Sequence, residues 1–133
     1  MAFGEENFSN VNLENANLQG VIWQNVKLCD ANLRNANLYG ANLFASDLSG
    51  ANCEDALFAG TSLEATDFRK VNLRNARFCK DNLGGINTLE GADFSETNLI
   101  EAKIEHGCAS YDEHTVFPDN FDPEEKKLKF IKK

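Results

Sequence analysis

The chain has 133 residues and a formal net charge of −8. The length supports one domain, and the acidic balance does not favour a protein that binds nucleic acid directly through a basic surface. No apolar run approaches the length of a membrane-spanning helix, and the first six residues carry neither the basic nor the apolar part of a secretory signal, so we expect no membrane association.

The dominant pattern is a large apolar residue at every fifth position, called position i below. A period of five fits neither the 3.6 residues per turn of an α-helix nor the alternation of an ordinary strand, so the repeat is a structural unit in its own right. The series is Phe3, Phe8, Leu13, Leu18, Trp23, Leu28, Leu33, Leu38, Leu43, Leu48, Cys53, Phe58, Leu63, Phe68, Leu73, Phe78 and Leu83, and after one extra residue Leu89, Phe94, Leu99 and Ile104.

The positions around i have their own residue types. Position i−2 is mostly Ala, Val, Ser or Thr, and because residues two apart share one face of an extended segment, i and i−2 should both point inward. Position i−1 is usually Asn or Asp. Position i+2 is rich in Gly and Asn, which tolerate a positive φ at least cost, so this position should lie at the corner of a turn.

Tandem A-(N/D)-L-x-x units, such as ANLRNANLYGANL from Ala31 to Leu43, resemble those of the pentapeptide repeat family, and the match covers Phe3 to Ile104. The resemblance implies an all-β fold, a right-handed quadrilateral β-helix in which four repeats form one coil and positions i and i−2 fill a square core. On this scheme we predict about five coils, with i positions 8–23, 28–43, 48–63, 68–83 and 89–104.

Charged residues offer a test of this register, because residues twenty apart should stack at about 4.8 Å. One stacked pair, Asp47 with Asp67, is alike in sign. The other six are opposite: Glu14–Arg34, Arg34–Glu54, Glu54–Arg74, Lys27–Asp47 and, across the extra residue, Arg69–Glu90 and Lys80–Glu101. Each exposed pair contributes about 0.2–1 kcal/mol, so the pairs are expected to favour the correct coil register.

The regular series is interrupted between Leu83 and Leu89, where the extra residue is best placed at a corner beside Gly84 and Gly85. Asp81 and Asn87 then hold i−2 positions that are otherwise small or apolar. Two interpretations remain: the polar side chains bond backbone groups freed by the bulge, or they form a ligand site. We favour the first, because polar side chains beside a bulge usually satisfy backbone groups.

Four cysteines occur in the chain. Cys53 takes position i and is expected in the core, whereas Cys29 and Cys79 take position i+1 on opposite faces, too far apart for a disulfide. Free thiols in a chain without a secretory signal predict a cytoplasmic location.

After Ile104 the five-residue pattern ends. We assign the β-helix to residues 1–108 and a capping segment to 109–133, in which TVFPDNFDP, from Thr115 to Pro123, resembles the tail of many bacterial pentapeptide repeat proteins. Asp122 as N-cap and Pro123 at the next position predict a short helix. Four apolar residues should cover the open end of the last coil: Phe117, Phe121, Phe130 and Ile131. The lysine-rich ending could instead touch nucleic acid or membrane, but its acidic neighbours favour a solvated tail.

No catalytic site can be assembled from this sequence, so we predict a protein that is not an enzyme and has no cofactor. The two histidines complete no set of nucleophile, base and orienting group, and the glycines follow the repeat instead of forming a phosphate-binding loop. Four residues whose side chains can bind metals lie close together in the sequence after the last repeat: His106, Cys108, Asp112 and His114. Their spacing matches no common zinc pattern, so we predict no metal site and leave the cluster as an open alternative.

Two functions from different classes remain. The first is a scaffold or protein-binding module that presents flat faces to a protein partner. The second comes from the family resemblance, because some pentapeptide repeat proteins mimic duplex DNA and bind a type II topoisomerase such as gyrase. Acidic and basic coils alternate here, whereas a mimic needs sustained negative potential along its length, so we favour the scaffold.

An apolar strip on the third face of the coil is the predicted contact surface. It consists of the i+1 residues Tyr39, Ala59, Cys79 and Ile100, with Leu57 in the neighbouring column. A contiguous apolar strip more often marks an interface than scattered apolar residues do. We therefore predict that this face binds a protein partner or pairs with the same face of a second copy, which would give a homodimer.

Overall fold

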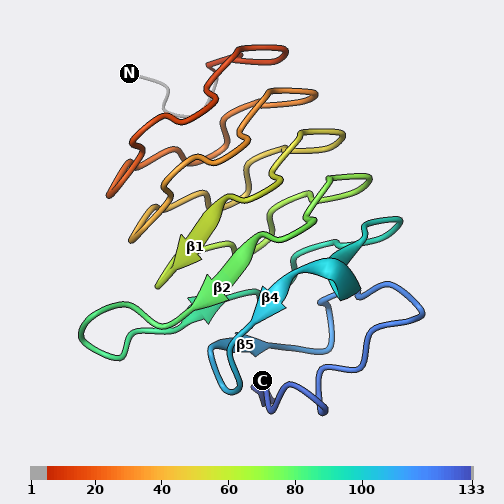
Figure 1. The fold of residues 1–133 in the computed structure, drawn as a ribbon. Helices are drawn as coiled ribbons and strands as arrows, with labels where there is room; N and C mark the ends of the chain where they lie inside the picture. Colours follow the sequence, from red (N-terminus) through yellow and green to blue (C-terminus); the bar gives the residue numbers. More distant parts are fainter. Residues whose placement is uncertain (1–5, 133) are drawn as a thin grey trace.

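The structure, a computed structural model, describes residues 6–132. The first repeat, at Phe3, lies outside this range. The chain winds into a stack of similar rectangular coils (Figure 1), with the last part of the chain crossing one end of the stack. Among the described residues no helix is long and apolar enough to cross a membrane.

Each side of the coil is one repeat, so position i forms four vertical columns, called here the first to fourth faces. Parallel bridges join residues twenty apart, as in Asn12↔Asn32 and Asn32↔Asn52. The first face has the i residues Phe8, Leu28, Leu48, Phe68, Phe94 and Phe117, and the second face has Leu13, Leu33, Cys53, Leu73 and Leu99. The third face has Leu18, Leu38, Phe58, Phe78 and Ile104, and the fourth face has Trp23, Leu43, Leu63, Leu89, Tyr111 and Phe130.

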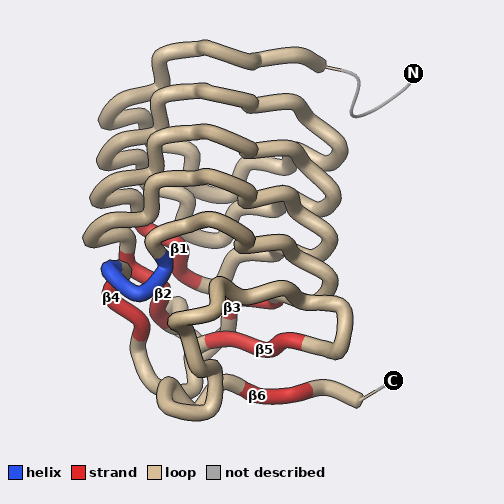
Figure 2. The backbone as a smooth tube through the Cα atoms, turned by 90° about the vertical axis from the view of Figure 1, so that its right-hand side faces the viewer, coloured by secondary structure: helices blue, strands red, loops and turns tan. Residues whose placement is uncertain are grey.

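Longer strands occur only toward the end of the stack that holds the last part of the chain, within the described residues. On the third face β1 (Leu57–Ala59), β2 (Arg77–Cys79) and β4 (Lys103–Ile104) form a parallel sheet in this order. On the fourth face β3 (Asn87–Thr88), β5 (Ala109–Tyr111) and β6 (Lys129–Phe130) do the same (Figure 2). A 3-10 helix, η1, spans Leu99–Glu101.

Local chemistry explains why each repeat turns after three residues. The i−1 side chain accepts a hydrogen bond from the backbone N–H two residues later, as Asn37 Oδ1 does from Tyr39 and Asp47 Oδ1 does from Ser49. This bond closes a small turn and leads into the corner residue, which has a positive φ, for example 66° at Gly40. The Asn or Asp of the repeat is therefore a turn-forming residue. The backbone N–H and C=O groups of the repeat bond to the adjacent coils, as the Leu38 N–H does to the Leu57 carbonyl.

The core is built as the repeat predicts. Position i and position i−2 are buried through the middle of the stack, and Cys53 is fully buried at an i position. Phenylalanines stack along the axis on two faces, with ring centroids 4.8 Å apart for Phe58 and Phe78 and 4.6 Å apart for Phe68 and Phe94. Offset aromatic pairs at this spacing add to the apolar burial.

The insertion after Phe78 is longer than the sequence suggested. Across the insertion the vertical step is twenty-six residues, as in Ser62↔Thr88 and Asp67↔Asp93, so six residues leave the coil and not one. Residues 80–85 form the loop, and Leu83, assigned to the core as position i, is 97% exposed. The prediction was wrong because Leu83 lies five residues after Phe78 and so fits the period by chance. The fourth coil therefore closes at Leu89, and Tyr111 takes the fourth-face position of the next coil.

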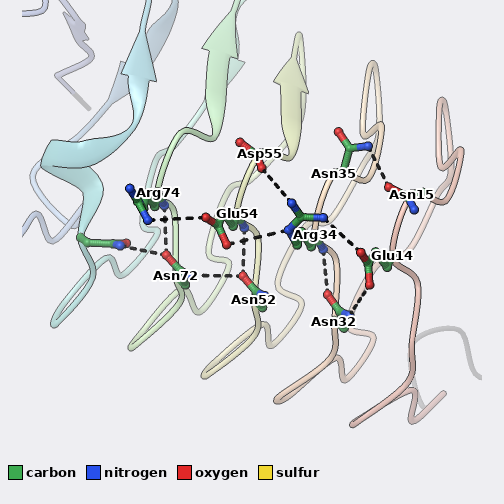
Figure 3. A network of polar contacts seen from close by, with 11 residues as sticks. Glu14, Asn15, Asn32, Arg34, Asn35, Asn52, Glu54, Asp55, Asn72 and Arg74 are labelled. Atoms are coloured by element: carbon green, nitrogen blue, oxygen red, sulfur yellow. Dashed lines mark hydrogen bonds and ion pairs between the residues drawn. The ribbon is translucent and has the colours of Figure 1, made fainter.

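Ion pairs follow the predicted register only above this loop. Arg34 lies 3.1 Å from Glu14 and 3.9 Å from Glu54, and Arg74 lies 3.9 Å from Glu54 (Figure 3). Lys27 stacks on Asp47 as predicted. Two pairs predicted across the insertion are wrong, because the step is twenty-six. Instead of Glu90, Arg69 binds Asp67 at 2.7 Å, and instead of Glu101, the Lys80 N–H donates to Glu105.

Reversing the charge of Arg34 tests the column of ion pairs. Arg34 contacts three carboxylates, those of Glu14, Glu54 and Asp55, and its side chain is 44% exposed. We expect Arg34→Glu to lower the free energy of unfolding by about 1 kcal/mol at low salt, and changing Glu14 and Glu54 to Lys to restore it. Denaturant unfolding of the single and combined variants measures this coupling, and additive effects would show that the column contributes nothing.

The capping segment contains turns where a helix was predicted. Residues 123–127 are turns, although Asp122 does cap them by accepting from the Glu124 N–H at 2.9 Å. Phe121 and Leu128 are buried against the last coil, while Phe130 and Ile131 stay about half exposed, at 53% and 40%. β5 pairs with β3, so the coil pattern continues past residue 108, where the capping segment was predicted to begin.

Candidate protein interface

The predicted strip is only partly assembled. Tyr39, Ala59 and Cys79 stack on the third face, with Leu57 beside them in β1. Ile100 does not join them. Because of the six-residue loop it lies in η1 on the second face, in the column that follows Arg74, and it is exposed there. The assignment of Ile100 to the strip was therefore wrong.

The chain itself covers this strip with the 80–85 loop. The backbone N–H of Asn82 donates to the Tyr39 hydroxyl at 2.6 Å, which joins residues 43 positions apart. Ala59, which faces outward from its strand, is only 1% exposed. The Asp81 carboxylate lies against Gly60, where an added Cβ would be 2.5 Å from its oxygen. The glycine at this corner therefore allows the loop to lie close to the coil.

Asp81 also organises the loop internally. Its Oδ1 accepts hydrogen bonds from the N–H groups of Leu83 at 2.9 Å and Gly85 at 2.7 Å, and its own N–H donates to the Gly85 carbonyl. Gly84 has a φ of 82° at the tip. These contacts confirm the prediction that Asp81 bonds backbone groups freed by the insertion.

A second polar residue, Asn87, connects the two ends of the loop to the coil by hydrogen bonds. Asn87 is fully buried, its Oδ1 accepts from the Thr61 N–H at 2.8 Å and from the Thr61 hydroxyl, and its Nδ2 donates to the carbonyls of Cys79 and Cys108. Every hydrogen-bonding group of this amide is used within the protein, so Asn87 is structural and offers nothing to a ligand.

Leu83 is the exposed element of this site. It projects from a loop held by Asp81 and Tyr39, and no large apolar residue among those described is more exposed. Sequence reasoning missed it because the period placed it in the core. The available signal was the polar Asp81 two residues earlier, at a position that should have been small and apolar.

The surroundings of the loop are basic. Arg77 and Lys103 are register partners in β2 and β4, and both are exposed on the third face, as is Lys80 at the start of the loop. Glu105 partly offsets them by accepting from the Lys80 N–H. The site therefore presents one apolar side chain beside a positively charged patch.

The alternative sites have little support. His106 and His114 are exposed while Cys108 is buried, and within residues 6–132 no group of three or more metal-ligand side chains is arranged to hold an ion. The apolar cavity between the last coil and the capping segment measures about 10 Å³, far below the 300–1,000 Å³ or so of ligand pockets.

All four cysteines are free. Burial raises the pKa of Cys53 to about 12 and also raises that of Cys79, where Arg77 opposes the effect. Since the thiolate is the reactive form, we expect a maleimide to label Cys29 first, Cys79 more slowly and Cys53 not at all in the native protein. Raising the pH from about 7 to about 9 should leave Cys53 unlabelled. Mass spectrometry of digests reports each site, and native labelling of Cys53 would contradict its place in the core.

The repeats of this chain match those of a known protein family. The family profile for pentapeptide repeats matches residues 7–43 and 46–85 with eight copies, more than half of the chain. The chain belongs to the pentapeptide repeat family. No curated protein matches this pentapeptide repeat protein by sequence.

Solved structures agree with this assignment. A pentapeptide repeat protein from the thylakoid lumen of Arabidopsis thaliana is 25% identical with a TM-score of 0.64, covering 86% of this chain and 70% of that one. QnrB1, a plasmid-mediated fluoroquinolone resistance protein, is 15% identical with a TM-score of 0.62, covering 96% and 72%. Rfr23 from the cyanobacterium Cyanothece 51142 is 22% identical with a TM-score of 0.53, covering 84% and 88%. The fold is thus a right-handed β-helix solenoid.

Proposed function

We propose that this pentapeptide repeat protein is a non-enzymatic scaffold, acting in the cytoplasm, that binds a protein partner through the 80–85 loop. The single observation that carries the proposal is the exposure of Leu83, 97%, on a loop that Asp81 orders internally and that the Asn82–Tyr39 hydrogen bond fixes to the coil. The family consists of structural and binding modules in general, and the free thiols fit a reducing compartment.

The chemistry of the loop defines the kind of partner. Transfer of one leucine side chain from water into an apolar pocket contributes about 1.5–3 kcal/mol. Because the loop is already ordered by hydrogen bonds, little of that energy is lost to ordering it on binding. Lys80 begins the loop, and Arg77 and Lys103 are exposed on the same face of the coil, so the partner should have an apolar pocket with an acidic rim.

Mimicry of duplex DNA is the weaker alternative. A column of three aspartates, Asp47, Asp67 and Asp93, does run down the first face. Arg69 binds Asp67 in the middle of that column, and Arg34 and Arg74 interrupt the acidic residues of the second face. A topoisomerase partner would need negative potential over many phosphate spacings, which these pairs do not supply.

Replacing Leu83 by Asp tests the proposed function. The side chain is in solvent, so the thermal midpoint should change by less than about 2 °C, while partner binding should weaken at least a hundredfold. Proteins from the native host captured on the wild type are identified by mass spectrometry, purified and titrated against both variants. Ile22→Asp is the matched control, because Ile22 is 74% exposed on the fourth face. A purified partner that binds L83D as tightly as the wild type would overturn the proposal.

The homodimer remains a separate prediction. Face-to-face pairing through Tyr39 and Ala59 would require the 80–85 loop to leave the third face, since the loop covers both. A second copy that paired through Leu83 would instead leave the loop in place. Light scattering of the wild type and L83D distinguishes these cases, because only pairing through Leu83 is lost in the variant.

A further inference from the structure

The last strand, β6, lies at an open sheet edge. It pairs with β5 on one side, and no strand of the described residues lies on its other side (Figure 2). The Ile131 N–H donates to the Tyr111 carbonyl at 2.8 Å, so in a parallel ladder the N–H and C=O of the preceding residue, Phe130, point away from β5. This edge can therefore accept one more strand.

The edge strand is also rich in lysine, with the carboxylates of Asp122 and Glu124 near Tyr111 in the neighbouring strand. Four of the seven residues from 126 to 132 are lysines, in a chain whose net charge is −8. Three of them, Lys127, Lys129 and Lys132, are exposed. Lysines on an edge strand oppose pairing with an identical strand, because the like charges would meet across the new ladder. The same lysines attract a strand that carries carboxylates.

Apolar side chains accompany the charges. Phe130 is 53% exposed although it occupies position i, with its ring 5.4 Å from that of Tyr111, and Ile131 is also exposed. Because side chains alternate along a strand, Phe130 lies on the core side while Lys129 and Ile131 lie on the outer side. A strand added below β6 would meet an aromatic surface on one side and a lysine on the other.

We propose that the β6 edge binds an acidic, extended peptide segment of a protein partner by strand addition. The backbone of Phe130 supplies the ladder hydrogen bonds. An apolar side chain of the segment packs on Phe130, and a carboxylate of an alternate residue pairs with Lys129 on the outer side. Capturing such a segment uses only exposed groups of β6 and requires no opening of the cap.

This site is independent of the proposed function. β6 belongs to the fourth-face sheet at the end of the stack, whereas the 80–85 loop lies on the third face. L83D should therefore leave peptide binding at β6 unchanged, so failure of either site can be told from failure of the other.

Titration calorimetry with the full chain and defined hexapeptides tests the proposal. The probe is an acetylated, amidated peptide of alternating valine and glutamate, and the same peptide with lysine in place of glutamate is its charge control. We expect the glutamate peptide to bind at low salt and the lysine peptide not to bind. Lys129→Glu should weaken the glutamate peptide about tenfold or more, while Lys27→Glu, in the second coil, should have no effect.

A third peptide tests the ladder itself. Methylation of alternate backbone nitrogens of the glutamate peptide removes its ladder donors, and we expect binding to be lost. Binding that survives methylation, or no binding of the glutamate peptide at all, would overturn the proposal. A chain that sediments as a dimer disrupted by K129E would assign the edge to a second copy. Salt-sensitive binding of a DNA duplex lost in the same variant would assign it to nucleic acid, and both results would contradict the acidic segment.

Discussion

Phe68→Ala is expected to lower the free energy of unfolding by about 3–5 kcal/mol, the largest effect of any single change considered. Phe68 is fully buried, its ring is stacked 4.6 Å from that of Phe94, and it meets the edge of Phe58 at 6.1 Å. Alanine would leave a cavity between two coils. Ladder hydrogen bonds fix the distance between the backbones of these coils, so the site cannot collapse to fill the cavity.

Equilibrium denaturation of Phe68→Ala, followed by circular dichroism, measures this loss. Phe44→Ala is the matched control, because Phe44 is a partly exposed residue of the fourth face and should cost well under half as much. Loss of less than about 1 kcal/mol at Phe68 would mean that the aromatic column does not stabilise the stack.

Asn87→Ala should lower the free energy of unfolding by about 2–4 kcal/mol. The change leaves the Thr61 N–H and hydroxyl without the Asn87 Oδ1 that they bond, whereas the carbonyls of Cys79 and Cys108 keep the backbone N–H groups of Gly60 and Asn87 as donors. Each buried group left unsatisfied costs about 1–3 kcal/mol, although part of that cost is recovered where water can enter.

Asn87→Ala should also make the 80–85 loop more mobile. The Asn87 side chain bonds the carbonyl of Cys79, the residue before the loop, and the N–H of Thr61 in the coil above. Hydrogen exchange of the Gly85 and Leu83 amides, which Asp81 protects, reports this directly. Gln24→Ala, an exposed change on the fourth face, is the control. Unchanged stability in Asn87→Ala would show that the buried amide contributes no net free energy.

Much of this fold follows from the repeat, because the residues of each five-residue unit determine both its turn and its contribution to the core. The Asn or Asp at i−1 closes the turn through its side chain, and the small i−2 residue and large i residue set the spacing of the core. The same unit holds even where the residue type is unfavourable: Ala45 and Lys70 take the corner conformation with φ of 56° and 62°. Ladder hydrogen bonds to the coils on either side outweigh the local preference there.

The candidate site was harder to predict, because its geometry depends on the length of an insertion. A period of five continues through Leu83 in sequence, whereas the chain has already left the coil at residue 80. This one error moved Ile100 to the wrong face and paired Arg69 and Lys80 with the wrong partners. No local propensity distinguishes one extra residue from six, since the cost of closing a loop rises only slowly with its length.

The capping segment shows a different limit. Asp122 caps the following turn as an N-terminal helix residue would, so the local signal was interpreted correctly. Leu128 then folds into the core beneath the last coil, and its N–H donates to the Pro123 carbonyl. Packing against the coil end thus ends the turn before a helix forms, and this contact is not visible in the sequence of the segment.

The central claim is that the 80–85 loop binds a partner while the β-helix acts only as its support. Deleting residues 81–86 tests both parts, because it restores a twenty-residue coil in which Lys80 occupies the corner, as Lys70 does in the repeat above the break. The Thr61–Asn87 contact is retained, so the coil should still close, which circular dichroism verifies before binding is measured.

The decisive measurement is the affinity of this deletion variant for the purified partner of the wild type, determined by calorimetry. If the loop is the contact, binding is lost or weakened at least a hundredfold while the spectrum of the folded β-helix is kept. Wild-type affinity in a correctly folded deletion variant would contradict the account and place the binding surface elsewhere on the coil.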